Sequence, residues 1–284
     1  MMDLFSWNRD KSGLGAGNMT RSEIVKKVQV NIPFSMLGEG YLDRFLNAGL
    51  NPEIGFDAQT LDHLRKAEVA AVAERFHAQG ATITCHGPFA DLSPGSLDPK
   101  IREITRYRFE QLLALLPVLK PKTVVCHAGY DENRYWYNKS RWIEESLGLW
   151  AWLAQRIKNE GAVLMLENVY ERHPEDVLAL LDPLGFHHVG FCLDTGHQAV
   201  FGHVGLENWM DTLGPFLGQV HLHDNGGEKD DHLALGGGRV DFKRFFEKLR
   251  SIKTEAPVMT LEPHRERDLQ PSLEYLEKIW PWSD

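Results

Sequence analysis

Short apolar runs that end in a glutamate, an aspartate or a histidine recur along this chain. They are ATITCH ending at His86, KTVVCH ending at His127, AVLMLE ending at Glu167, VGFCLD ending at Asp194, QVHLHD carrying His221 and His223, and PVMTLE ending at Glu262. A helix-like segment precedes each run. Functional groups at the carboxyl ends of parallel strands are typical of a (β/α)8 barrel. We therefore expect these side chains to gather around one mouth of a closed barrel.

The alternation of strand-like and helix-like segments continues through eight units. The expected strands cover 28–32, 52–56, 81–86, 122–127, 162–167, 189–194, 218–223 and 257–262. We predict a single α/β domain over 28–284, a (β/α)8 TIM barrel, after a loose N-terminal extension over 1–27. An open doubly wound sheet is the alternative. It is disfavoured because such a sheet concentrates its site at one switch point, whereas ligand-type residues here end six of eight runs.

The pattern between the second and third runs predicts one long amphipathic helix over about 60–79. An apolar stripe with a period of 3.6 residues supports this helix: Leu61, Leu64, Ala67, Ala71 and Val72. Gly80 follows at the position where a glycine commonly ends a helix.

Composition narrows the classes of function. The 284 residues exceed the roughly 250 that one barrel requires. The net charge of -9 gives no global attraction to nucleic acid or to an anionic membrane. No apolar stretch reaches the roughly 20 residues of a membrane helix, and the N-terminus lacks the apolar segment of a signal peptide. Cys85, Cys126 and Cys192 lack C-x-x-C spacing and are expected to be reduced core residues. We expect a cytoplasmic protein that does not engage membranes.

Three carboxylates and one imidazole come from the last four strands. Glu167, Asp194, His221 and Glu262 each lie at or near a strand end. A carboxylate buried at a barrel mouth is costly unless a cation pairs with it. This donor set suits a divalent metal such as Zn or Mn. The alternative is an ion-paired plug without metal.

Five further residues have metal-ligand chemistry. His197 lies three residues after Asp194, Asp230 and His232 form a D-x-H pair, and His86 and His127 end the third and fourth strands. Each of the histidines could instead be a mouth residue that bonds to a neighbour. Together with the first four, these nine groups could hold up to three ions, so we expect one to three.

Seven motifs appear in an order and spacing similar to those of one known superfamily. The segments HGPF, VCHAG, LENV, GFCLDTGH, HLHDN, DHLALGGG and LEPH resemble the xylose isomerase-like TIM-barrel superfamily over roughly residues 28–282. That superfamily contains small-sugar and sugar phosphate isomerases and epimerases. It also contains endonuclease IV, a trinuclear-zinc enzyme that cuts DNA at abasic sites.

The isomerase branch of the resemblance implies a mononuclear centre. Glu167 and Glu262 would flank one metal held with Asp194 and His221, and would act as general base and acid on a C–H that the metal acidifies. His197 would contact a substrate hydroxyl. We expect this function, with a small carbohydrate as the substrate.

The endonuclease IV-like branch is the alternative, and it implies three zinc ions. The nine positions would be divided as His86, His127 and Glu167 at the first ion, Glu167, Asp194, His221 and Glu262 at the second, and His197, Asp230 and His232 at the third. Nucleic acid is an expected partner only under this alternative.

The chain departs from both patterns. Several ketose epimerases carry an arginine where this chain has Gly227. Endonuclease IV has a cysteine where this chain has Gly196, and an H-L-N-D segment followed by a lysine where this chain has HLHDNGG. The loop PFSMLGEG has neither lysine nor arginine, and DNA binding takes its affinity from phosphate neutralisation.

The remaining mouth residues are candidates for substrate contact. His223 and His264 follow the last two strands, and Trp136 belongs to the aromatic segment YDENRYWYNKSRW. Such aromatic residues cover a sugar or stack on bases. Alternatively they pack on a helix or on another subunit of a homo-oligomer. The glycines of GGG at 236–238 form either a phosphate-binding nest or a tight turn.

Overall fold

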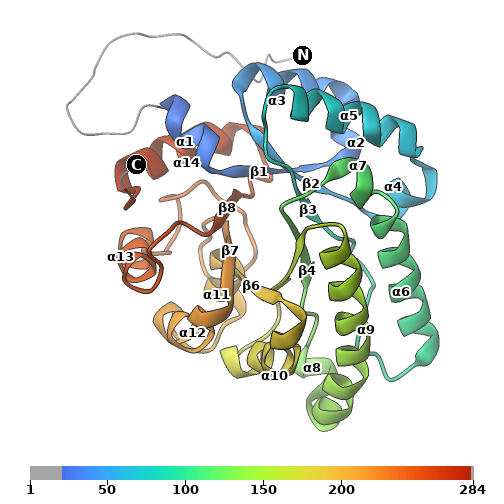
Figure 1. Ribbon diagram of the computed structural model, residues 1–284. Helices are drawn as coiled ribbons and strands as arrows, with labels where there is room; N and C mark the ends of the chain where they lie inside the picture. The colour runs from blue at the N-terminus through green and yellow to red at the C-terminus, as the bar shows by residue number, and fades with distance from the viewer. Residues whose placement is uncertain (1–20, 283–284) are drawn as a thin grey trace.

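Eight parallel strands close into a barrel in the computed structural model, which describes residues 21–282 (Figure 1). Each strand pairs with the next in sequence, and the first pairs with the last. The strands are β1 (Gln29–Pro33), β2 (Asn51–Gly55), β3 (Thr84–His86), β4 (Thr123–His127), β5 (Val163–Glu167), β6 (Val189–Asp194), β7 (Leu217–Leu222) and β8 (Val258–Leu261). The prediction of a single (β/α)8 TIM barrel is confirmed.

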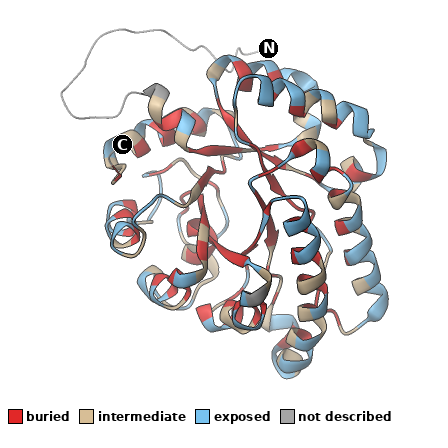
Figure 2. Ribbon diagram, viewed as in Figure 1, coloured by how far each residue is buried: buried red, intermediate tan, exposed pale blue. Residues whose placement is uncertain are grey.

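Helices surround this barrel and cover its outer face (Figure 1). They are α1 (Arg21–Lys27), α2 (Phe34–Met36), α3 (Leu42–Ala48), α4 (Ala58–His63), α5 (Lys66–Ala78), α6 (Pro99–Leu113), α7 (Leu116–Leu119), α8 (Glu132–Tyr135), α9 (Lys139–Asn159), α10 (Pro174–Leu184), α11 (Thr195–Phe201), α12 (Leu206–Leu213), α13 (Phe242–Ile252) and α14 (Glu266–Ile279). Figure 2 shows the strands as largely buried, with exposed residues on the outward faces of the helices. None of the helices in the described range 21–282 is long and apolar enough to span a membrane.

The apolar residues separate into two groups, as strand alternation requires. The large group lies between strands and helices, whereas Val125, Met165 and Cys192 form a small cluster of their own. Met165 lies two residues before Glu167 and shares its face of β5, so this small cluster lies beneath the strand-end carboxylate. Cys85, Cys126 and Cys192 are buried free thiols, as expected for core cysteines.

The prediction of a loose extension over 1–27 is wrong for its last seven residues. Residues 21–27 form α1, in which Ile24 is 0% and Val25 is 5% exposed. This apolar pair is buried as α1 packs against α14, and that burial outweighs the polar surroundings in sequence. Residues 1–20 lie outside the described part of the chain.

The single long helix expected over 60–79 is also wrong, because the chain breaks between α4 and α5. Leu64 and Arg65 are extended, with ψ of 149° and 135°. The Glu68 side chain accepts a hydrogen bond from the Arg65 backbone N–H at 3.1 Å, which starts a new helix there. The buried face of α5 is Val69, Ala73 and Phe76, rather than the expected stripe. Gly80 follows α5 with a φ of +71°, so its predicted place at the helix end is confirmed.

Candidate metal centre

Four ligand-type residues from the last four strands converge at the carboxyl end of the barrel. We call them the barrel centre: Glu167, Asp194, His221 and Glu262, whose ligand atoms all lie within 4.8 Å of one another. Strand register places them, since Asp194 lies opposite His221 in the β6–β7 pair. Glu262 directly follows β8. The closed barrel thus brings together residues that are up to 95 positions apart in sequence (Glu167 to Glu262).

The imidazole of His221 lies between two carboxylates of the barrel centre. Its Nδ1 is 3.3 Å from Glu167 Oε1 and 3.1 Å from Glu262 Oε1, and 4.0 Å from Asp194 Oδ2. Both His221 and Glu167 are fully buried. One nitrogen therefore faces oxygens from three different strand ends.

Two atoms of this arrangement make no hydrogen bond although they are buried. They are Glu167 Oε1 and His221 Nδ1. An unpaired buried polar atom is expensive, and native structures contain few of them. Three carboxylates and one imidazole nitrogen are a donor set that divalent Zn or Mn accepts. The residues present therefore fit a divalent metal ion at the barrel centre.

Glu53 in β2 supports His221 from below. Its Oε1 lies 3.0 Å from His221 Nε2. Its Oε2 accepts hydrogen bonds from Thr84, Gln219 and Thr260 at 2.9, 2.6 and 3.1 Å. When His221 Nε2 carries the proton toward Glu53, Nδ1 presents its lone pair to the barrel centre. A carboxylate in this place fixes the tautomer and orientation of a metal-binding histidine. Sequence analysis missed Glu53.

The charges of the barrel centre hold one another in their ionised forms. Burial alone would raise the pKa of Glu167, but the charge of His221 and the hydrogen bonds of His197 and His221 outweigh it and hold that pKa well below its usual range. Burial opposes protonation of His221, yet the surrounding acidic groups, including Glu262 and Glu53, raise its pKa well above the ordinary value. A cation at this position, whether a proton or a metal ion, is therefore strongly favoured.

His86 and His127 lie on the other side of Glu167. Their Nε2 atoms are 3.1 and 3.6 Å from Glu167 Oε2. His86 Nδ1 lies 2.9 Å from the Gly87 carbonyl oxygen, which leaves Nε2 directed at the carboxylate. Desolvation lowers the pKa of His127 to about 3, so its imidazole is neutral and available as a ligand. Phe89, which is 54% exposed, stacks on His127 at 4.3 Å between ring centroids.

A second group of four ligand-type residues adjoins the barrel centre. We call it the loop cluster: His197 in α11, His223 after β7, and Asp230 and His232 in the loop that follows, with ligand atoms within 4.8 Å of one another. His232 has a φ of +46°, a backbone conformation that non-glycine residues rarely adopt. Strain of this kind persists where the surrounding structure enforces it.

The loop that carries Asp230 and His232 is organised by Asp224, a residue that sequence analysis did not single out. Asp224 is fully buried and its carboxylate accepts backbone N–H groups from Gly236, Gly238 and Val240 at 3.1, 2.9 and 3.0 Å. Asp224 and Leu233 also pair as an isolated antiparallel bridge. The backbone N–H groups of the glycine segment thus bind the carboxylate of Asp224. The segment is a turn around this side chain rather than a phosphate site.

The other expected substrate contacts lie at different places. His264 stacks on His232 with 3.5 Å between ring centroids, which places it beside the loop cluster. Trp136 is 68% exposed and packs edge-on against Tyr137 in the segment after β4. His223 lies inside the loop cluster and is 1% exposed, so the structure groups it with the ligand-type residues.

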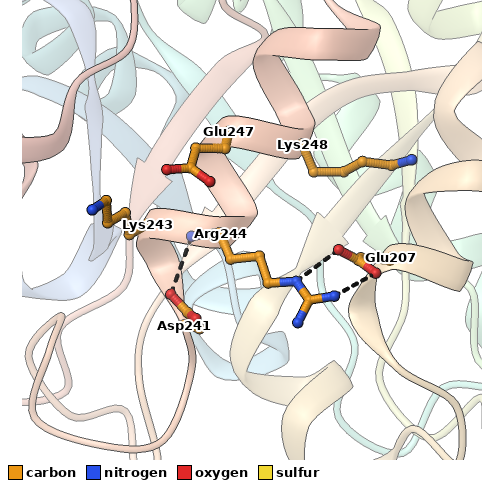
Figure 3. Close-up of a pocket in the computed structure, with 6 residues that line it drawn as sticks. All are labelled: Glu207, Asp241, Lys243, Arg244, Glu247 and Lys248. Atoms are coloured by element: carbon orange, nitrogen blue, oxygen red, sulfur yellow. Dashed lines mark hydrogen bonds and ion pairs between the residues drawn. The ribbon is translucent and has the colours of Figure 1, made fainter.

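A separate hollow of about 500 Å³ lies outside the barrel, along α12 and α13. Figure 3 shows its charged lining, in which Arg244 reaches across to Glu207. The Arg244 guanidinium makes two hydrogen bonds to Glu207, at 2.7 and 2.9 Å, and Lys248 pairs with Asp211. Arg244 and Lys248 are therefore already paired with carboxylates of the protein itself.

Comparisons with known proteins agree with the barrel fold. The family model described as xylose isomerase-like TIM barrel matches residues 52–279. A probable endonuclease 4 from Mycobacterium ulcerans is 26% identical over 213 residues, which cover 69% of this chain and 80% of that protein. An uncharacterized protein from Methanocaldococcus jannaschii is 27% identical over 203 residues, 69% of each chain.

Solved structures share the whole barrel. A protein from Thermus thermophilus, soaked with ZnCl2, superposes with a TM-score of 0.74 and 26% identity, over 89% of this chain and 97% of that one. A D-tagatose 3-epimerase-like protein has a TM-score of 0.76 with 21% identity, over 89% and 97% of the two chains. At that identity the second likeness establishes the fold alone.

Proposed function

Because the chain belongs to the xylose isomerase-like TIM-barrel family, we propose that it is a divalent-metal-dependent isomerase or epimerase of a small sugar or sugar phosphate. One observation carries the proposal. Glu167 and Glu262 approach His221 Nδ1 from two strands, at 3.3 and 3.1 Å, so two carboxylates flank the position that a metal would share with them.

This arrangement provides the parts that proton transfer at carbon requires. A bound divalent ion would polarise the carbonyl and hydroxyl oxygens of a substrate and acidify the C–H between them. Glu167 and Glu262 hold the general base and acid positions. Return of the proton to the opposite face of the same carbon epimerises the sugar, and return to the neighbouring carbon isomerises it. Phe89 offers an exposed ring face over His127 for the C–H face of a sugar.

An endonuclease IV-like phosphodiester hydrolase is the second candidate. The nine expected ligands lie around one mouth, and several curated relatives are probable endonuclease 4 proteins. Three cations of the mouth loops lie beside carboxylates, which counts against DNA because phosphate neutralisation needs free positive charge. Lys139 pairs with Asp176, Arg172 lies 2.7 Å from Glu132, and Lys229 lies 3.2 Å from Asp231.

Solvent exchange separates the two functions. Aldoses, ketoses and their phosphates are incubated in D2O with the enzyme and added Zn or Mn, and NMR follows the C–H beside the carbonyl. We expect loss of that proton signal and appearance of the epimer or isomer for at least one sugar. Cleavage of DNA that carries an abasic site, without exchange in any sugar of the panel, would instead establish the hydrolase.

A further inference from the structure

We propose that Tyr170 and Phe201 form an aromatic platform for a second sugar ring, so that the substrate is a glycoside or disaccharide rather than a monosaccharide. The inference rests on the proposed function, because it names the substrate class of the barrel centre. Tyr170 lies three residues after the end of β5, and Phe201 is the last residue of α11, which follows β6. Both therefore belong to the loops at the carboxyl end of the barrel, where the barrel centre lies.

Tyr170 is an exposed ring on a segment that is otherwise buried. Asn168 and Glu171 are each 1% exposed and Val169 is 6% exposed, whereas Tyr170 is 52% exposed. Packing within the chain therefore does not account for a large aromatic side chain at this position. Exposed rings recur in the loops after β3, β4 and β5, where Phe89, Trp136 and Tyr137 also lie open to solvent. Aromatic side chains gathered at a barrel mouth are typical of a surface that binds a ligand.

Hydrogen bonds on both sides of Tyr170 hold its backbone in place. The Glu171 carboxylate accepts the backbone N–H of Val169 at 2.8 Å. The Arg172 guanidinium lies 2.7 Å from Glu132 in the loop after β4, and the Arg172 carbonyl oxygen accepts the N–H of His203, just after α11, at 2.8 Å. The loops after β4, β5 and β6 are thus joined into one frame. A ring displayed from such a frame loses little conformational entropy when a ligand binds.

A path of aromatic rings leads from the barrel centre to Tyr170. His197 Nδ1 lies 3.3 Å from Glu167 Oε1 of the barrel centre. The Phe201 ring centroid lies 6.2 Å from that of His197, and 5.1 Å from that of Tyr170 with 68° between the planes. Tyr170 thus stands two ring contacts beyond a residue that touches the barrel centre. A sugar unit at the barrel centre would lie beside His197, and a second unit linked to it would extend over the aromatic platform.

The charges near the aromatic platform favour a neutral second unit. Arg172 pairs with Glu132, and Lys139 pairs with Asp176. Neither cation is free to neutralise a phosphate, from which a nucleic acid strand takes its affinity. An uncharged sugar ring has an apolar C–H face that an aromatic ring can cover, and its hydroxyls remain in water. It therefore fits this surface better than a phosphorylated unit does.

Turnover of matched sugars tests the proposal in the wild-type protein. Glucose and fructose are compared with the reducing disaccharides lactose, cellobiose, maltose and isomaltulose in D2O with added Zn or Mn. NMR follows the C–H beside the carbonyl of the reducing unit. We expect kcat/KM for at least one disaccharide to exceed that for its matched monosaccharide by at least about 5-fold, because stacking on an aromatic ring contributes that much. Equal values for every pair would overturn the proposal.

Variants assign the advantage to the ring. Tyr170→Ala should remove the disaccharide's advantage through a higher KM and leave exchange in the monosaccharide at the wild-type rate. Tyr170→Phe keeps the ring and should keep the advantage. Tyr107→Ala is the matched control, since Tyr107 is a tyrosine on α6 that is 49% exposed. If exchange in both sugars fell together in Tyr170→Ala, or if Tyr107→Ala lost the same advantage, the assignment would be refuted.

Binding measured without turnover separates this proposal from the proposed function. Lactitol and maltitol carry a second sugar ring on an open chain of hydroxyls, whereas sorbitol is that chain alone. Isothermal titration should show tighter binding of lactitol or maltitol than of sorbitol, and Tyr170→Ala should abolish the difference. That result without exchange in any sugar would refute the proposed reaction and support the platform. Equal affinities for the three alcohols would refute the platform, even where a monosaccharide exchanges. Slower cleavage of abasic-site DNA by Tyr170→Ala, with sugar binding unchanged, would assign the ring to nucleic acid instead.

Discussion

Gly196 leaves the space that the imidazole of His223 fills. A β-carbon on Gly196 would lie 2.0 Å from Cε1 and 2.3 Å from Nδ1 of His223. These are two of the positions at which the sequence departs from the endonuclease IV pattern, which has a cysteine and an asparagine there. The two departures therefore belong together. Gly196 in α11 has no side chain, and the imidazole of His223 after β7 occupies the space beside it.

Gly196→Ala tests this relationship. The new methyl group should displace the His223 ring and break its 3.1 Å hydrogen bond to Asp194 Oδ2, so that metal affinity at the barrel centre falls by about 10- to 100-fold. Zinc competition against a chromophoric chelator measures the loss. Gly148→Ala is the control, because a β-carbon there meets no atom within 4 Å. It should bind zinc normally and gain up to about 1 kcal/mol from helix propensity. Equal zinc affinity in both variants would contradict the steric argument.

Glu53→Gln should weaken metal binding at the barrel centre, although residue 53 is not itself a candidate ligand. The amide no longer holds the proton on His221 Nε2, so Nδ1 is presented to the barrel centre only part of the time. Loss of such a supporting group costs about 10- to 100-fold in metal affinity. Isothermal titration with Zn or Mn measures the change. Glu110→Gln, which breaks the exposed Arg106–Glu110 pair, provides the comparison and should leave affinity at the wild-type value.

Glu262→Gln and Glu167→Gln should each remove proton exchange into substrate. A general acid or base contributes about 10²- to 10⁴-fold to rate, and each glutamate is also a candidate ligand. Exchange into the sugar in D2O is measured beside the metal content of each variant. Glu207→Gln, on the outer surface of the barrel, should exchange at the wild-type rate. Full turnover in Glu167→Gln would show that the reacting groups lie elsewhere.

Glu171 should make the protein less stable as pH rises toward neutrality. Burial raises the pKa of Glu171 to about 7, although its carboxylate accepts backbone N–H groups from Val169 and Tyr130. Between roughly pH 4.5 and pH 7 the unfolded chain therefore releases a proton that the folded chain retains. The free energy of unfolding falls over this interval, by up to roughly 3 kcal/mol.

Urea unfolding at pH 5 and pH 7.5 compares the wild type with Glu171→Gln, both freed of metal by chelation. The variant loses a backbone acceptor at both pH values, but it should lack this part of the pH dependence. Parallel pH profiles for the two proteins would show that Glu171 does not titrate in this range.

The strand ends were predictable because an apolar run and the acidic or histidine residue that ends it are both local features of the sequence. The break at Leu64–Arg65 was not, since no proline or glycine marks it and the capping contact of Glu68 competes with an unbroken helix. Glu53 lies in the middle of a strand, where a single glutamate gives no periodic signal, and its partners lie up to 207 residues away. The contact of His223 with Asp194 joins residues 29 positions apart, and only coordinates contain that information.

The hydrogen bonds and the ion pair of Glu53 also affect how the barrel closes during synthesis of the chain. A nascent chain that has emerged as far as β5 contains Glu53 and Thr84, but Gln219, His221 and Thr260 are still to be translated. A half-barrel that buried this carboxylate would leave it without most of its donors, which is unfavourable. Docking of β7 and β8 supplies those donors and the last ligands of the barrel centre in the same step. Metal capture at the barrel centre would thus report that β8 has docked and that the barrel has closed.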